Sequence, residues 1–451
     1  MRCEIPAFFK QIAANGMSNA SLLSLWRSTT FRGSAANAFY NTMEYVSQPA
    51  LMIVCAPFLV SHLGLELYGI WMLVSALAGT VGVFHIGLGD ATIKCVSACR
   101  GKGDIEGVGR MIRGTLTLSL FLGGLTAITV FLIAPYFVRH VFKIAPHNAS
   151  VAATAMQLGG LLLWIQSVFS VFSNSLKAHE EFGVPVKITI ALKTGIMGLA
   201  VVLVMMGHGV VAIMLATLGG TLIGTACLGL AIHRLMPTCS LLPTFDRHAW
   251  REVLHFGWYS WIQNTAGVAF SQADRLLIAA LLGAGPLAYY TLCIQIAQQI
   301  HALPSAAFGF LFPHISAKQA SGHNRDIKRV YHLSVIANII VSIALALPLV
   351  LLSKRILTVW MGADFAAHAH RLLSILAVAF CVLSVNVAPH FTLLGLGKVR
   401  FVSFVNVAGG IFSLAGAAIL INPLGLAGAA IGRLLYGPAI SANYIKVERI
   451  L

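Results

Sequence analysis

Charged side chains occur inside long apolar segments of this sequence, where each needs a partner or a function. Arg433 falls near the middle of the last such segment, and the adjacent pair Asp274-Arg275 lies within another. A charge near the centre of a bilayer costs about 2.5–3.5 kcal/mol on insertion scales. The guanidinium of Arg433 could bind a phosphate group through parallel hydrogen bonds, or pair with a buried carboxylate on another helix. Either interpretation places Arg433 inside a helix bundle.

The other ionisable candidates also have two interpretations each. Neighbours on a helix point in different directions, so Asp274 and Arg275 are not natural partners. Arg275 could be a second cation for the same anion, and Asp274 could bind a coupling proton or cation or form a stabilising ion pair. Glu44, ahead of two prolines in the first apolar segment, is either a coupling or sugar-contacting group or a surface carboxylate. Asp90 and Lys94 lie where the second segment ends, as solvated loop charges or where a charged headgroup would enter.

Uncharged polar residues add a weaker signal. They could line a hydrated cavity that binds sugar, or they could form hydrogen bonds between helices. The candidates for a binding role are Gln263, Asn264 and Gln295, with Gln272, Gln298 and Gln299 nearby, and the histidines that could titrate or simply pack are His85, His301 and His390.

The amino-acid composition indicates what kind of structure must position these residues. Of the 451 residues, 58% are hydrophobic and 10% are charged, whereas soluble domains carry about 25% charged residues. The mean hydropathy is +0.85. This excludes a large soluble domain and predicts a polytopic membrane protein. The eight cysteines contain no CxxC pair, so neither a metal nor a cofactor is expected.

A bilayer core about 30 Å thick needs about 20 apolar residues per helix. This length predicts an all-α fold of about twelve spans in two bundles of six. The expected spans are roughly 37–60, 68–89, 111–134, 153–176, 187–206, 210–232, 257–281, 286–312, 330–352, 371–394, 399–420 and 424–443.

The positions of the 30 Lys and Arg predict the orientation. With these spans, 23 cations fall on one side, five on the other and two inside the membrane. Cytoplasmic loops carry the excess of Lys and Arg, so both termini are expected in the cytoplasm. This bias and a lumen that accepts an anion could each contribute to the net charge of +16, and no nucleic-acid partner is expected. The expected organisation is a cytoplasmic tail (1–36), a six-helix bundle (37–235), a cytoplasmic linker (236–256), a second six-helix bundle (257–445) and a cytoplasmic tail (446–451).

The two halves also echo each other. The loop with Gly103-Asp104-Ile105 is matched by the loop with Arg325-Asp326-Ile327, and Gly209-Val210-Val211-Ala212 is matched by Gly425-Leu426-Ala427-Gly428. Two six-span repeats enter the membrane from the same side. We therefore expect a repeat axis along the membrane normal and a substrate site at the interface.

Several of these motifs resemble a known family. The segment Leu63-Gly64-Leu65-Glu66-Leu67-Tyr68-Gly69-Ile70-Trp71 is similar to the signature after the first span of bacterial polysaccharide transporters. Gly87-Leu88-Gly89-Asp90-Ala91-Thr92 and Asp274-Arg275-Leu276-Leu277-Ile278 resemble the second-span exit and the seventh-span motif of the same group. This group, which includes O-antigen flippases, is a branch of the multidrug/oligosaccharidyl-lipid/polysaccharide exporter superfamily. The resemblance implies a MATE-like, V-shaped pair of bundles in the bacterial inner membrane.

The resemblance also implies a function. A member of this branch would move undecaprenyl-diphosphate-linked oligosaccharide, such as an O-antigen, capsule or exopolysaccharide repeat unit, from the cytoplasmic to the periplasmic leaflet by alternating access. Its partners would be that glycan, membrane lipid and a glycan polymerase complex. No GxxxxGK[ST] nucleotide loop occurs in the sequence, so an ion gradient or the membrane potential would supply the energy. The alternatives are an ion-coupled multidrug exporter, whose lumen should be rich in carboxylates, and a membrane glycan polymerase or ligase. The enzyme alternative lacks an evident acid–base pair.

Overall fold

The computed structural model of this chain describes residues 43, 47–179, 181–237, 243–246, 250–251, 253–254, 272–320 and 324–451, and it contains no strand within them. A helix satisfies its backbone N–H and C=O groups within one segment, which lipid demands. The all-α prediction is therefore confirmed. The tail predicted over residues 1–36 and the candidate residues Glu44, Gln263 and Asn264 lie outside the described residues.

The N-terminal half consists of long, continuous helices. Asp104 caps one of them, because its Oδ1 accepts a hydrogen bond of 2.7 Å from the backbone N–H of Gly107. Gly64 and Gly207, with φ of +79° and +84°, turn the chain between neighbouring helices at a conformation that favours glycine. The helices are Ser47–Leu63, α3 (Leu65–Gly101), α4 (Ile105–His140), the 3-10 turn η1 (Pro146–Asn148), α5 (Ala149–Ala178), α6 (Gly183–Met205) and α7 (Val210–Leu235).

The C-terminal half consists of shorter helices. The first described segment spans residues 272–281. It is followed by α9 (Ala284–Ala297), α10 (Gln299–Phe308), α11 (Leu311–Ala320), α12 (Asn324–Leu351), α13 (Ser353–Met361), α14 (Ala363–Val385), α15 (Val387–Gly395), α16 (Val399–Leu424), α17 (Leu426–Leu434) and α18 (Gly437–Ile450). α18 continues as a helix through most of the predicted C-terminal tail.

Three of the expected spans are therefore interrupted, a feature that the apolar pattern did not predict. The span 286–312 is divided among α9, α10 and α11. The span 371–394 is divided between α14 and α15, and the span 424–443 is divided between α17 and α18. The interruptions of these last two spans follow from proline. Pro389 and Pro438 have no N–H to donate to the carbonyl four residues earlier. Those carbonyls belong to Val385 and Leu434, which are the last residues of α14 and α17.

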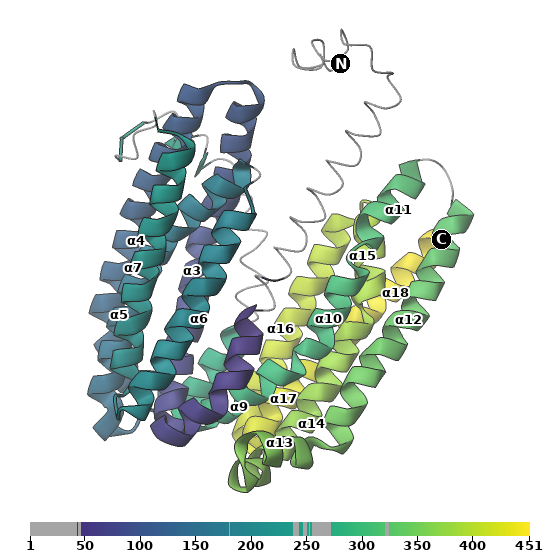
Figure 1. Cartoon of the computed structure of the whole chain (residues 1–451). Coiled ribbons are helices and arrows are strands. Elements are labelled where there is room, and N and C mark those ends of the chain that lie inside the picture. The colour runs from purple at the N-terminus through teal and green to yellow at the C-terminus, as the bar shows by residue number, and fades with distance from the viewer. Residues whose placement is uncertain are drawn as a thin grey trace.

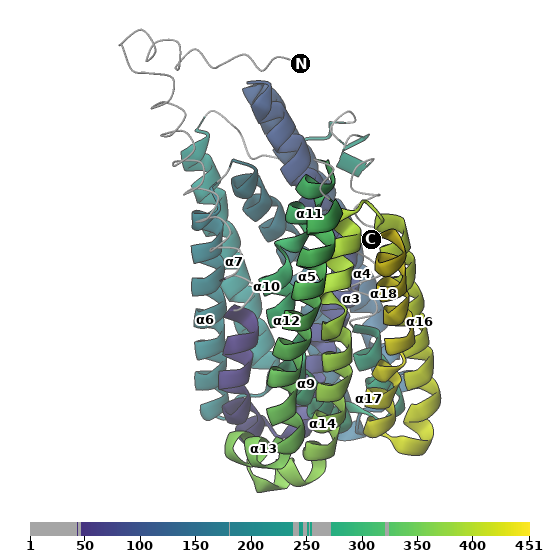
Figure 2. The same cartoon turned by 90° about the vertical axis from the view of Figure 1, so that its right-hand side faces the viewer.

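The two halves lie side by side and diverge toward one end (Figure 1). The helices α3 to α7 form one bundle and the helices from α10 to α18 form the other. They approach each other at the end that carries α9 and α13, and separate toward the end that carries α11. The view from the C-terminal half shows α12 and α14 at the front, with α16, α17 and α18 along one side (Figure 2). The expected arrangement of two bundles is thus present.

Close backbone contacts join the two halves where they converge. A Cβ atom added to Gly69 of α3 would lie only 1.8 Å from the carbonyl oxygen of Ala284 in α9. The backbone N–H of Lys143 donates to the carbonyl of Ala279 at 3.3 Å, and Nε1 of Trp360 donates to a carbonyl of the first helix at 2.8 Å. We call these contacts the seam; it consists of Ile53, Gly69 and Lys143 on one side and of Ala279, Ala284 and Trp360 on the other.

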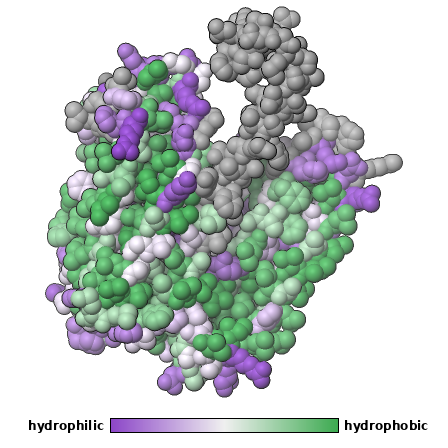
Figure 3. Space-filling view, in the orientation of Figure 1, coloured by the Kyte–Doolittle hydropathy of each residue, from purple (hydrophilic) through white to green (hydrophobic). Residues whose placement is uncertain are grey.

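The outer surface of the molecule fits a bilayer. Hydrophobic side chains cover the middle of the face in Figure 3, and hydrophilic ones gather toward its two ends. Large apolar residues such as Leu132, Phe404 and Ile419 are exposed. The described helices that are long and apolar enough to cross a membrane number seven: Ile105–His140, Pro146–Ala178, Gly183–Met205, Val210–Leu235, Asp326–Leu351, Ala363–Gly395 and Val399–Leu424. The count of twelve spans and the cytoplasmic termini stay predictions.

Candidate functional site

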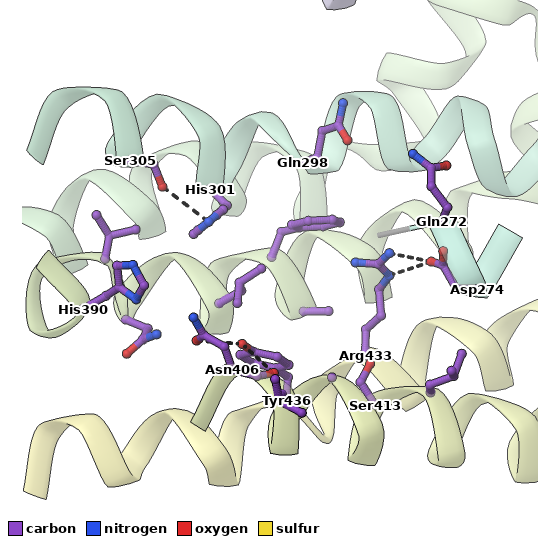
Figure 4. Close-up of a pocket in the computed structure, with 18 of the residues that line it drawn as sticks. Gln272, Asp274, Gln298, His301, Ser305, His390, Asn406, Ser413, Arg433 and Tyr436 are labelled. Carbon is purple, nitrogen blue, oxygen red and sulfur yellow. Dashed lines mark hydrogen bonds and ion pairs between the residues drawn. The ribbon is translucent and has the colours of Figure 1, made fainter. Parts of the chain in front are cut away.

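A cavity of about 1370 Å³ lies inside the C-terminal half (Figure 4). Its described walls come from the segment 272–281 and from α9, α10, α14, α15 and α16, and they also include Arg433 of α17 and Tyr436 just after it. The three interrupted spans, 286–312, 371–394 and 424–443, all contribute residues to these walls. In transporters, discontinuous helices expose backbone groups and polar side chains to a water-filled site. The interruptions therefore mark this cavity as the candidate site.

The break between α14 and α15 is stabilised by side chains from two other helices. Because Pro389 lacks an N–H, the carbonyl of Val385 loses its partner within the helix. That carbonyl accepts hydrogen bonds from Nδ2 of Asn338 on α12 at 3.1 Å and from the hydroxyl of Tyr444 on α18 at 2.7 Å. Nδ2 of Asn338 also reaches the carbonyl of Ser384 at 2.9 Å. An unpaired buried carbonyl would cost about 1–3 kcal/mol, so these contacts fix the break in place.

An ion pair joins the two charged positions that were most prominent in the sequence. Nη2 of Arg433 lies 2.5 Å and its Nε lies 3.0 Å from Oδ2 of Asp274. The hydroxyl of Tyr290 donates to the same carboxylate oxygen and accepts from Nε of Arg433 at 2.9 Å. The ring of Phe380 lies 5.2 Å below the guanidinium carbon. Arg433 is thus held by an interhelical carboxylate, which was one of the two interpretations of its charge.

The ion pair leaves part of Arg433 directed toward the cavity. Nε and Nη2 form the edge that faces Asp274, and Nη1 has no partner among the described residues (Figure 4). Both side chains are largely buried, with 19% of Arg433 and 7% of Asp274 exposed. Gly432 lets α17 approach closely, since an added Cβ would lie 2.4 Å from the backbone N of Ala417 in α16. This close packing sets the position of Arg433.

Arg275 forms a second cationic wall beside this pair. Its Nη1 donates to Oε1 of Gln272 at 3.2 Å, and its buried Nε has no hydrogen-bond partner within the described part of the chain. Both residues line the cavity. As expected from helix geometry, Arg275 and Asp274 contact different side chains.

The opposite end of the cavity is polar and carries no carboxylate among its described residues. Nε2 of His301 lies 3.3 Å from Oγ of Ser305, and His390 lies at the same end (Figure 4). The hydroxyl of Tyr436 donates to Oδ1 of Asn406 at 3.0 Å. In the whole described lining, the charged residues are the cations Arg275, Arg400 and Arg433 and the carboxylate Asp274. The cavity is therefore suited to an anion with polar substituents.

Other sequence candidates lie away from this cavity. Gln295 is 7% exposed, and its Nε2 lies 3.9 Å from Sδ of Met72 on α3, so it belongs to the packing between the halves and not to the described cavity wall. Asp90 and Lys94 lie on α3 in the N-terminal half, and Lys94 is exposed.

The sequence reasoning missed several residues of the site. Tyr290, Asn386, Asn406 and Tyr436 are uncharged, and nothing separated them from polar residues that merely join helices. One signal was available for Asn386 and Tyr436, because each lies close to Pro389 or Pro438 in an apolar segment. A polar residue beside a proline in a span is placed where the backbone is irregular.

The fold defines the class of protein. The chain is similar to an inward-facing conformation of a multidrug resistance MATE family transporter of the MOP superfamily, with a TM-score of 0.77 and 15% identity over 88% of this chain and 93% of that one. An outward-facing conformation of a multidrug resistance MATE family transporter of the same superfamily gives a TM-score of 0.58 at 14% identity, over 92% and 91% of the two chains. The chain therefore has the fold of the MATE transporters.

The sequence comparisons define the family. Residues 67–369 match the family described as polysaccharide biosynthesis protein, so the chain belongs to that family. It is 21% identical over 396 residues to the "Putative O-antigen transporter" of Shigella flexneri, covering 88% of this chain and 93% of that protein. It is 22% identical over 413 residues to the "Uncharacterized membrane protein EpsK" of Bacillus subtilis (strain 168), covering 84% and 79%. The recognition made from the motifs is therefore confirmed as to family and fold: the chain belongs to a polysaccharide family and has the fold of the MATE transporters.

Proposed function

We propose that this protein is a flippase that carries undecaprenyl-diphosphate-linked oligosaccharide from the cytoplasmic to the periplasmic leaflet by alternating access. The observation that carries the proposal is the cationic cavity, in which Arg433 is held by Asp274 on one edge and keeps Nη1 for a ligand. A diphosphate offers oxygens that a guanidinium binds strongly. The polyprenyl chain would stay in lipid while the headgroup occupies the cavity.

The shape of the molecule supports loading from the cytoplasm. The bundles diverge at the end where α3 is followed by α4 and where α11 ends and α12 begins (Figure 1). The sequence predicts that this end is cytoplasmic, because Lys and Arg are frequent at and around these helix ends: Arg100, Lys102, Arg110, Lys318, Arg325, Lys328 and Arg329. The higher similarity to an inward-facing MATE structure is consistent with this state.

The geometry gives Asp274 a specific role in this proposal. Its Oδ2 receives two donors from Arg433 and one from Tyr290, so a resident cation already occupies it. Asp274 then orients Arg433 for the diphosphate, and it could bind a coupling ion only if Arg433 released it during the cycle. A multidrug exporter for cations should present open carboxylates, and the described cavity wall presents only this neutralised one.

A flipping assay tests the proposal. The purified chain is placed in proteoliposomes with a fluorescent lipid-linked glycan, and the variants Arg433→Ala and Arg433→Lys are compared with the wild type. A charged hydrogen bond contributes about 1.5–3 kcal/mol, so we expect flipping at limiting substrate to fall at least about tenfold in the alanine variant and less in the lysine variant. Arg139→Ala, which removes an exposed arginine at the end of α4, is the matched control.

A second variant separates loss of binding from misfolding. Removing one partner of a buried ion pair leaves an uncompensated charge and can cost about 3–5 kcal/mol. The double variant Arg433→Leu with Asp274→Leu removes both charges together and should insert and fold. Flipping at the wild-type rate by this stable double variant would overturn the proposal.

A further inference from the structure

Two asparagine side chains on the cavity wall have their carboxamide oxygens held by residues at or within α18. Oδ1 of Asn386, at the break between α14 and α15, accepts a hydrogen bond of 2.9 Å from Nδ2 of Asn443. Oδ1 of Asn406, on α16, accepts a hydrogen bond of 3.0 Å from the hydroxyl of Tyr436. The two positions that donate are seven residues apart, which places them on one face of a helical segment.

This arrangement decides which edge of each amide is left for a ligand. An asparagine has an acceptor oxygen and an NH₂ group with two donors. The oxygens of Asn386 and Asn406 are engaged, and neither Nδ2 has a hydrogen-bond partner among the described residues. Both residues line the cavity, and Asn386 is 5% exposed. The cavity lining therefore includes an NH₂ donor group at each of these two positions.

The network behind Asn386 is buried, and Tyr436 behind Asn406 is partly buried. Asn443 and Asn338 are 0% exposed, and they contact the α14–α15 break from opposite helices. The ring of Tyr436 packs against Gly409 of α16, where an added Cβ would lie 2.8 Å from the ring. In these contacts each amide directs its oxygen to the partner and leaves its NH₂ group without one.

We propose that Asn386 and Asn406 form a glycan subsite that recognises a neutral carbonyl oxygen, as in an acetamido sugar. The inference rests on the proposed function and adds the substrate class. Asn406 and Tyr436 lie between the histidines and the Arg433–Asp274 pair (Figure 4). A headgroup that places its diphosphate at Arg433 would direct its sugar toward this wall. Asn443 and Tyr436 act as positioning residues, since they contact the amides and not the sugar.

The experiment measures binding to the purified full-length chain by microscale thermophoresis. The probes are farnesyl diphosphate alone and farnesyl diphosphate linked to N-acetylglucosamine, glucose or glucosamine. A neutral hydrogen bond contributes about 0.5–1.5 kcal/mol, so we expect the wild type to bind the acetamido probe roughly 2- to 12-fold more tightly than the glucosyl probe. It should bind the amino probe, whose ammonium group only donates, more weakly than the acetamido probe.

The variant Asn406→Asp provides the sharpest comparison. It keeps the shape of the side chain and an oxygen for the hydroxyl of Tyr436, and it replaces the cavity-facing donor by an acceptor. We expect the order of the acetamido and amino probes to reverse, which a purely structural role would not cause. Asn386→Asp should act in the same direction. Tyr436→Phe keeps the ring, frees the amide of Asn406 and should lower the acetamido preference, whereas Tyr136→Phe makes the same change at an exposed site on α4.

The outcomes separate this inference from the proposed function. If farnesyl diphosphate does not bind at all, the proposed function fails and the subsite fails with it. If farnesyl diphosphate binds but the wild type treats the three sugar probes alike, only the subsite is overturned. An unchanged probe order in a monodisperse Asn406→Asp variant would also overturn the subsite.

Discussion

Replacing Gly69 by alanine places a methyl group in the seam between the two halves. The new Cβ would lie 1.8 Å from the carbonyl oxygen and 2.6 Å from the carbonyl carbon of Ala284. Ordinary contact begins at 3.4 Å, so α3 and α9 would have to separate locally by about 1.6 Å. Both clashing atoms belong to backbone, and no side-chain rotation can relieve them. The substitution therefore acts on the conformation in which the seam is closed.

The expected size of the effect follows from the packing. Overpacking a well-packed region typically costs about 1–3 kcal/mol. Conformations in which the halves have separated here do not carry that cost. The equilibrium should therefore shift roughly 5- to 150-fold away from the closed seam. The shift changes the populations of conformations and leaves the helices themselves intact.

Double electron–electron resonance spectroscopy can measure this shift. Spin labels at His208→Cys, in the turn between α6 and α7, and at Asn422→Cys, near the end of α16, would report the distance between exposed positions of opposite halves, in a background without the eight native cysteines. We expect Gly69→Ala to populate longer distances. Gly198→Ala on α6 is the matched control, because its Cβ would meet nothing within 4 Å. Identical distance distributions for wild type and Gly69→Ala would refute the reasoning.

Two further substitutions test the walls of the cavity. Asn338→Leu removes one of the two donors to the carbonyl of Val385 and the side-chain donor to the carbonyl of Ser384; we expect the free energy of unfolding in detergent to fall by about 1–3 kcal/mol, and an unchanged melting temperature would contradict this. Gly432→Ala should push α17 from the backbone of α16 and displace Arg433, lowering both the stability, by about 1–3 kcal/mol, and the affinity for farnesyl diphosphate. Gly219→Ala, with open space around its Cβ, should leave both measurements at wild-type values.

The sequence predicted the fold class because composition alone decides it. A chain with 58% hydrophobic and 10% charged residues must place its helices in lipid. The continuous apolar pattern hid the interruptions of the C-terminal helices, however. Pro389 and Pro438 were visible, but a proline in a span can be tolerated in a continuous helix when neighbours supply partners. Only the packing of α12 and α18 against Val385 decides that the helix breaks there.

The charged part of the site was more predictable than its neutral part. Each intramembrane charge had to face the interior because exposure to lipid is costly, and this identified Asp274, Arg275 and Arg433. Their pairing was not predictable, because Asp274 and Arg433 are 159 residues apart. A neutral amide does not carry the energetic cost that a charge has in lipid, so its position is less constrained. Gln295 and Asn406 are of the same chemical kind, and only tertiary packing assigns the first to an interface between the halves and the second to the cavity wall.

The helix α9 joins the candidate site to the seam within a short distance. Ala284 begins the helix and contacts Gly69, and Tyr290, six residues further on, contacts Asp274 and Arg433. Six residues of helix span about 9 Å, so a change at the ion pair and a change in the seam act on one rigid element.

This connection has a thermodynamic consequence. If farnesyl diphosphate changes the seam equilibrium by some factor, then changing the seam equilibrium must alter its affinity in the reciprocal way. The binding and distance measurements on Gly69→Ala therefore form one cycle. We expect the variant to bind farnesyl diphosphate less tightly than the wild type if the closed seam favours loading from the cytoplasm. Equal affinities, together with a shifted distance distribution, would mean that the seam and the site move independently, and α9 would then be only a structural connection.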